Sequence, residues 1–93
     1  MTTNRIRYIV RYTGHVQGVG FRMTAVLQAN GLDVNGFVRN EPDGSVTMDV
    51  EATKADMKQL IRRIASAMSG RIDGTSIDER PPKDRTDGFR IEY

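Results

Sequence analysis

The sequence predicts a single α+β domain in which an antiparallel sheet carries two helices on one face. Two-residue alternation of apolar and polar side chains marks strands near both ends and in the middle of the chain, and two segments between them show helical periodicity. No repeat, low-complexity segment or linker divides the 93 residues, a length that fits one core. We therefore expect residues 1–93 to form one domain.

The first half of the chain begins with a strand, a loop and a helix. The strand is predicted over residues 5–12, where apolar and aromatic side chains alternate with arginines. A loop rich in glycine follows over residues 13–20. Apolar residues then recur at i, i+4, i+7 spacing, which predicts a helix over residues 21–32 with Gly31 near its end.

A β-hairpin is predicted next, with strands over residues 36–40 and 45–50. The connecting residues 41–44 read Glu-Pro-Asp-Gly. Proline fixes the backbone for the first central position of a turn, and glycine adopts the left-handed conformation that a later position requires. This composition therefore favours a tight turn between the two strands.

The second helix has the clearest periodicity, with apolar residues at helical spacing from Met57 to Met68. Thr53 followed by Asp56 resembles a capping box at its start, and Gly70 is suited to end it. These features place the helix between residues 53 and 70.

Two more strands are expected after this helix. The first, over residues 71–80, has a poor pattern, because Ile72 and Ile77 share a face only if Gly74 forms a β-bulge. The second covers residues 89–93, where apolar side chains alternate. The order β-α-β-β-α-β, with one further short strand, is that of the ferredoxin-like fold.

Composition narrows the chemistry that this domain can perform. The chain has no cysteine and one histidine, which excludes a thiolate nucleophile and a cysteine zinc site and gives no support to a histidine metal site. We expect no metal and no cofactor. The remaining functional groups are carboxylates, guanidinium groups, hydroxyls, amides and backbone N–H groups.

Charge gives no sign of a nucleic-acid or membrane partner. Fourteen Lys and Arg face twelve Asp and Glu, the signs are interspersed, and the net charge is only +2. No apolar stretch has the length of a membrane span, and the first residues do not read as a signal peptide. We expect a cytoplasmic protein that binds neither nucleic acid nor membrane.

The loop before the first helix has features of an anion site. Its glycines let several backbone N–H groups point into one concavity, the following helix adds a positive N-terminus, and Arg22 supplies a two-pronged donor. The same spacing also fits a tight connection beside a solvated arginine. Phe21-Arg22 stand where a nucleotide P-loop has Lys-Ser/Thr, and Met23 stands where the dinucleotide fingerprint has glycine.

Two motifs resemble those of the acylphosphatase family. Residues 14–22 read Gly-His-Val-Gln-Gly-Val-Gly-Phe-Arg, similar to the signature Gly-x-Val-Gln-Gly-Val-x-Phe-Arg. Residues 36–46 match the second stretch, Gly-Trp/Phe-Val-x-Asn-x-x-Asp-Gly-x-Val, at the same separation, and residues 88–93 resemble the last strand. Departures are minor: Phe37 replaces the more usual Trp, and residues 32–35 read Leu-Asp-Val-Asn.

The resemblance implies the ferredoxin-like fold and hydrolysis of the carboxyl–phosphate bond of acyl phosphates, without a metal ion or a phosphoenzyme. It implies that Arg22 binds phosphate and that Asn40 positions the attacking water. The implied cradle of backbone N–H groups comprises His15, Val16, Gln17, Gly18, Val19 and Gly20. The implied partners are a small acyl phosphate and inorganic phosphate, and we expect a monomer.

Other classes of protein share this element order. RNA-recognition domains have it too, although the strand over residues 45–50 carries no stacking aromatic residue. A catalytically silent module that binds RNA or a small anion is therefore the alternative. The same domain also occurs in hydrogenase-maturation carbamoyltransferases, for which carbamoyl phosphate is the expected substrate.

Overall fold

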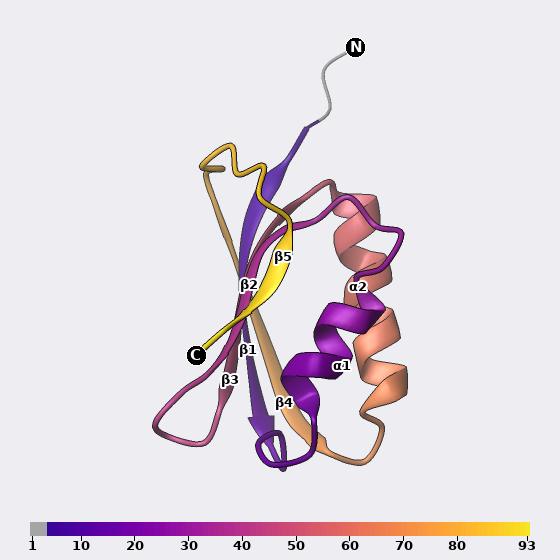
Figure 1. The fold of residues 1–93 in the computed structure, drawn as a ribbon, viewed down its shortest axis with the longest axis vertical. Coiled ribbons are helices and arrows are strands. Elements are labelled where there is room, and N and C mark those ends of the chain that lie inside the picture. Colours follow the sequence, from indigo (N-terminus) through magenta and orange to yellow (C-terminus); the bar gives the residue numbers. More distant parts are fainter. Residues whose placement is uncertain (1–3) are drawn as a thin grey trace.

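The computed structural model describes residues 4–93 and contains five strands and two helices (Figure 1). Their order along the chain confirms the predicted succession of elements. The bounds are β1 (Ile6–Gly14), α1 (Phe21–Gln28), β2 (Asn35–Asn40), β3 (Val46–Ala52), α2 (Lys54–Ala67), β4 (Ile72–Arg80) and β5 (Phe89–Glu92).

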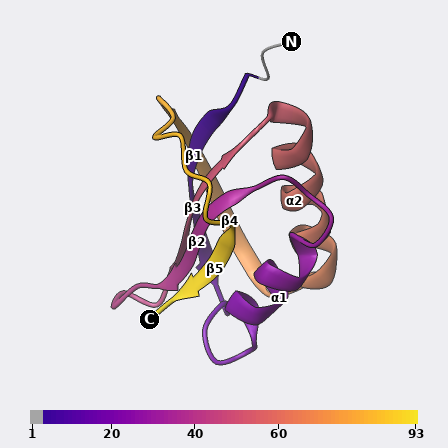
Figure 2. The same cartoon turned by 45° about the horizontal axis from the view of Figure 1, so that its top comes forward.

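All five strands form one sheet in the order β4-β1-β3-β2-β5, and both helices cover the same face of it (Figure 2). The pairs β1–β3, β1–β4 and β2–β3 are antiparallel, which confirms the ferredoxin-like arrangement. The last strand, β5, pairs in parallel with β2, so the complete sheet is mixed rather than wholly antiparallel. Its direction follows from the connection over residues 81–88, which stays at the end of the sheet where β4 finishes and β2 begins (Figure 1).

The strand boundaries differ from the sequence-based expectation by at most two residues, and the end of the first helix differs by four. The first strand continues to Gly14, because it keeps pairing with β4 beyond residue 12. The first helix ends at Gln28 instead of residue 32. The N–H of Ala29 is shared between the carbonyls of Ala25 and Val26, and Gly31 then turns the chain with a positive φ of 82°.

The predicted irregularity in the fourth strand is present. Thr13 pairs with Gly74, whereas Gly14 pairs with Ile72, so the register of the β1–β4 ladder shifts at this point. The shift puts Ile72 on the same face of the sheet as Ile77, which pairs with the buried Val10. A β-bulge thus lets this poorly patterned segment turn both isoleucines toward the helices.

The hydrophobic core lies between the sheet and the two helices. It includes Tyr12 and Phe21, whose ring centroids are 4.9 Å apart, and this pair ties β1 to the start of α1. On α2, Leu60 and Ile64 are fully buried against the sheet. Core packing therefore fixes the end of β1 and the start of α1, and with them the two ends of the loop that joins these elements.

The opposite face of the sheet carries a buried ion cluster. Asp49 is only 5% exposed and accepts two hydrogen bonds from Arg7, at 2.9 and 2.7 Å, and one from Arg85 at 2.6 Å. Glu51 accepts the backbone N–H of Lys83 at 2.6 Å. The segment before β5 is thereby attached to the helix-free face of β3.

This cluster should make stability depend on acid pH. Burial acts to raise the pKa of Asp49, but the hydrogen bonds and charges of Arg7 and Arg85 hold the pKa at about 2. The ionised form is thus favoured by folding, and its contribution of about 2 kcal/mol is complete above pH 4 and lost as the pH falls through 2. Asp49→Asn should remove this part of the pH dependence, measured by urea unfolding at pH 5 and pH 2.

A surface carboxylate provides the control for this measurement. The Oδ2 atom of Asp78 lies 3.9 Å from Nη2 of Arg80, and the side chain of Asp78 is 66% exposed. Exposed ion pairs contribute little to stability, so Asp78→Asn should keep the acid sensitivity of the unaltered protein. Equal loss of acid sensitivity in both variants would contradict the role of the Asp49 cluster.

Candidate active site

The loop between β1 and α1 forms a turn whose shape depends on two glycines. Gly18 and Gly20 have φ of 74° and 75°, in the left-handed region that favours glycine. Val16 is 1% exposed and holds the loop to the core. The loop is therefore fixed by its buried valine, while the glycines on either side of Val19 stay at the surface.

The backbone N–H groups of this loop fall into two kinds. His15 donates its N–H to the carbonyl of Arg71 at 2.9 Å, which leaves that group unable to hold an anion. Within the described part of the chain, the N–H groups of residues 16–20 donate to no backbone carbonyl. Gly20 occupies the N-cap position before α1 and provides no side-chain cap, and the first turn of the helix has no acidic residue. An anion would supply the missing acceptors.

Arg22 lies in the first turn of α1, where a cation is disfavoured by the helix dipole. Its guanidinium carbon lies 5.0 Å from the centre of the Tyr93 ring. Among residues 4–93 it takes part in no ion pair, in contrast to Arg7, Arg11 and Arg39. An anion bound at the helix start would offset the unfavourable interaction of Arg22 with the helix dipole, and it would also give Arg22 an ion-pair partner.

Asn40 is the last residue of β2 and pairs with Val46 across the hairpin. It lines the same cavity as Arg22, Gly18 and Gly20, with a volume of about 220 Å³. Among the described residues, Arg22 has the only charged side chain in the lining, and the other lining side chains are apolar or neutral. The cavity thus combines one cation, free N–H groups and one amide, a set suited to an oxyanion.

Gln17 joins the loop to the hairpin that carries Asn40. Its side-chain N–H₂ donates to the carbonyls of Glu41 and Ser45 at 2.8 and 2.9 Å. Gln17 therefore offers its side chain to the hairpin rather than to the cavity. The contact fixes the distance between the free N–H groups and Asn40.

Gln17→Ala should lower kcat/KM about tenfold and reduce the free energy of unfolding by about 1–2 kcal/mol, because two hydrogen bonds are lost and the loop moves relative to Asn40. Steady-state kinetics and urea unfolding measure the two effects. Gln59→Ala, on the exposed side of α2, is the matched control and should change neither. Unchanged kinetics in Gln17→Ala would show that this contact does not set the geometry of the cavity.

The two carboxylates that follow Asn40 in the hairpin, Glu41 and Asp43, accept hydrogen bonds from neighbouring side chains. The hydroxyl of Thr47 and the guanidinium of Arg39 lower the pKa of Glu41, which accepts hydrogen bonds from both. Asp43 accepts from the N–H and hydroxyl of Ser45 and pairs with Arg11 at 2.6 Å. Hydrogen bonds from Ser45 and Arg11 lower the pKa of Asp43. Both carboxylates stay ionised and stabilise the turn, so neither is suited to act as a general base.

Two lining residues were not singled out by the sequence: Met23 and Ile91. Ile91 and Tyr93 alternate in the last strand, which indicates a shared face, but only the parallel β2–β5 pairing places that face beside Arg22. Because Tyr93 ends the last predicted strand, the sequence also suggested that its carboxylate could pair with Arg22; the structure brings these two residues together, but the contact is made by the ring of Tyr93.

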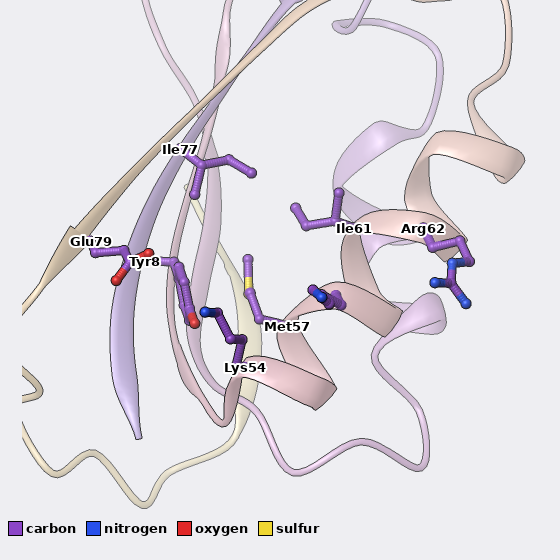
Figure 3. Close-up of a pocket in the computed structure, with 8 residues that line it drawn as sticks. Tyr8, Lys54, Met57, Ile61, Arg62, Ile77 and Glu79 are labelled. Atoms are coloured by element: carbon purple, nitrogen blue, oxygen red, sulfur yellow. The ribbon is translucent and has the colours of Figure 1, made fainter. Parts of the chain in front are cut away.

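A larger hollow, of about 450 Å³, lies at the opposite edge of the sheet between α2 and β4 (Figure 3). Apolar side chains of Tyr8, Met57, Ile61 and Ile77 form its floor, and its charged rim includes Lys54 and Glu79. No loop of free N–H groups borders it, so its size does not make it the anion site. In residues 4–93 no three metal-binding side chains are grouped, and no helix is long and apolar enough to cross a membrane.

Fold and cavity together define a small ferredoxin-like domain with a candidate site for a phosphate-like anion. Comparison with known proteins identifies the family: the acylphosphatase profile matches residues 8–91. Acylphosphatases of Salinibacter ruber and Enterococcus faecalis are 38% and 40% identical over 86 and 80 residues. These alignments cover 91% and 84% of this chain and 90% and 88% of the relatives. The chain belongs to the acylphosphatase family and is a hydrolase that acts on acid anhydrides.

Solved structures agree with this assignment. The crystal structure of acylphosphatase from Bacillus subtilis matches with a TM-score of 0.85 and 25% identity, over 95% of this chain and 99% of that one. Full-length HypF in its phosphate- and nucleotide-bound form also matches with a TM-score of 0.85 and 25% identity. The match covers 100% of this chain but only 12% of HypF, so a domain with this fold also forms part of a much larger protein.

Proposed function

We propose that the chain binds the phosphate of an acyl phosphate in the cavity at the start of α1 and hydrolyses it with a water held by Asn40. One observation carries the proposal: the cavity brings Arg22, the loop with free N–H groups and Asn40 together, and none of the described residues in its lining has an acidic side chain. Val16, Gln17, Gly18, Val19 and Gly20 provide the N–H groups. His15 flanks the cradle, because its own N–H is bound to Arg71.

Charge stabilisation accounts for most of the proposed catalysis. The loop N–H groups and Arg22 hold the non-bridging phosphate oxygens, on which negative charge is spread in the transition state. The water oxygen attacks phosphorus as the bond between phosphorus and the bridging oxygen breaks, and the electron pair leaves with the carboxylate. The carboxylate is a good leaving group, so general-acid assistance is not required.

Asn40 orients the water but does not take its proton, because an amide is not basic near pH 7. A phosphate oxygen of the substrate accepts that proton, and the products are a carboxylate and inorganic phosphate. Arg22 and the loop N–H groups balance the charge in this scheme, which therefore invokes no metal ion and no phosphoenzyme.

The alternative as a silent binding module has less support. The helix-free face of β3, where an RNA-recognition domain has stacking aromatics, presents Asp49 and Glu51, and the segment before β5 covers both. The family assignment also favours the hydrolase. That the protein acts as a monomer in the cytoplasm stays a prediction, which light scattering and cell fractionation can test.

A turnover assay in the presence of a metal chelator tests the proposed function. Acetyl, carbamoyl and benzoyl phosphates are supplied as substrates, and inorganic phosphate as a competitor. We expect hydrolysis that the chelator does not affect and that phosphate inhibits competitively. Absence of turnover with all three substrates would contradict the proposal.

A further inference from the structure

An exposed apolar surface begins beside the cavity. The structure describes four exposed large hydrophobic side chains, and three of them, Met23, Leu27 and Tyr93, lie on α1 and immediately after β5. Met23 and Leu27 are 55% and 63% exposed and one helical turn apart, so they share a face of the helix. Clustered exposed apolar side chains beside a polar site mark a surface that binds a ligand.

This surface follows the boundary between α1 and β5, two elements that are in contact. At the cavity, the boundary is lined by Met23, Ile91 and Tyr93. Farther along α1 it opens into a hollow of about 480 Å³, whose lining includes Leu27 and Phe89. Because α1 begins at the cavity and β5 ends there, the two hollows lie in succession along one line. We name the two hollows and the surface between them the α1–β5 groove; its apolar side chains are Met23, Ile91 and Tyr93 at the cavity and Leu27 and Phe89 at the second hollow.

We propose that the α1–β5 groove binds the acyl chain of the substrate, so that the enzyme prefers acyl phosphates with an extended straight-chain alkyl group. The inference rests on the proposed function, because the phosphate must occupy the cavity for its acyl group to reach the groove. From Met23 to Leu27 the helix advances about 6 Å, which gives room for several methylene groups. The groove offers such a chain apolar contacts on both sides, from α1 and from β5.

A series of straight-chain substrates isolates the contribution of the groove. Acetyl, butanoyl and octanoyl phosphates contain the same reactive bond, and their chains differ only away from the carbonyl. Each methylene that the groove half-buries strengthens binding, so kcat/KM of octanoyl phosphate should be about tenfold above that of acetyl phosphate, mainly through a lower KM. The assay is run below the micelle concentration of the longest substrate.

Two serine variants compare the groove with the rest of the surface. Leu27→Ser removes an exposed apolar side chain from the groove, and Ile77→Ser removes one from β4 at the opposite edge of the sheet. The octanoyl-to-acetyl ratio of kcat/KM should fall to about threefold in Leu27→Ser. Ile77→Ser should keep the ratio and both rates of the unaltered protein.

Each outcome of this experiment decides a different point. Equal kcat/KM for all three substrates, or an equal fall of the ratio in both serine variants, would overturn the role of the groove while leaving the proposed hydrolysis intact. No hydrolysis of any substrate would overturn the proposed function, and the inference with it. A ratio that rises with chain length and falls only in Leu27→Ser supports the proposal.

Discussion

Arg22→Ala should lower kcat/KM for acyl phosphates by a factor of about 10²–10³ and abolish competitive inhibition by inorganic phosphate. Among the described residues, Arg22 has the only charged side chain in the lining of the cavity, so its removal leaves the backbone N–H groups as the main donors to the phosphate. Both the bound ground state and the transition state carry that charge. KM should therefore rise as kcat falls.

The fold should survive this substitution. Arg22 has no ion pair within residues 4–93, and its contact with the Tyr93 ring lies at the surface, where such interactions contribute little. Arg62→Ala, on the exposed side of α2, is the matched control and should keep normal kinetics. Arg22→Lys should recover only part of the activity, because an ammonium group lacks the planar two-pronged donor. Normal phosphate inhibition in Arg22→Ala would exclude the assigned role.

Local signals explain how much of the fold the sequence could predict. The alternation in β1, the Glu-Pro-Asp-Gly turn and the periodicity of α2 each depend on residues close together in the chain. The capping interaction also belongs to this class, since the N–H of Asp56 donates to the hydroxyl of Thr53 at 3.2 Å. Such features are set by short-range sterics and hydrogen bonding, which a single sequence displays.

Long-range packing explains what the sequence could not predict. Asp49 alternates with buried residues in β3 and reads as a solvated position, but the segment carrying Arg85 folds over it and buries it. The parallel β2–β5 pairing likewise brings Tyr93 to Arg22, 71 positions earlier in the chain. Nothing in the sequence around Asp49 indicates Arg85, and nothing around Arg22 indicates a contact with the ring of Tyr93. The candidate site could be located from its loop motif, but its apolar side could not.

Asn40→Ala should differ from Arg22→Ala in one respect: it should retain inhibition by inorganic phosphate. Turnover should fall by a factor of about 10²–10³, while the inhibition constant for inorganic phosphate changes little. The amide carries no charge and contributes little to anion binding compared with Arg22 and the loop N–H groups, so its proposed contribution arises only when a water attacks. The loss should accordingly appear in kcat with KM nearly unchanged.

Two further variants distinguish water positioning from support of the hairpin. Asn30→Ala replaces an exposed asparagine beyond α1 and should leave kinetics and stability unchanged. Asn40→Asp nearly preserves the shape of the side chain but puts a negative charge beside the phosphate, so it should weaken phosphate inhibition as well as turnover. If Asn40→Ala weakened phosphate inhibition as strongly as Arg22→Ala does, the asparagine would be holding the cradle in place. If Asn40→Ala loses turnover but is still inhibited by phosphate, the asparagine acts on the attacking water and not on phosphate binding.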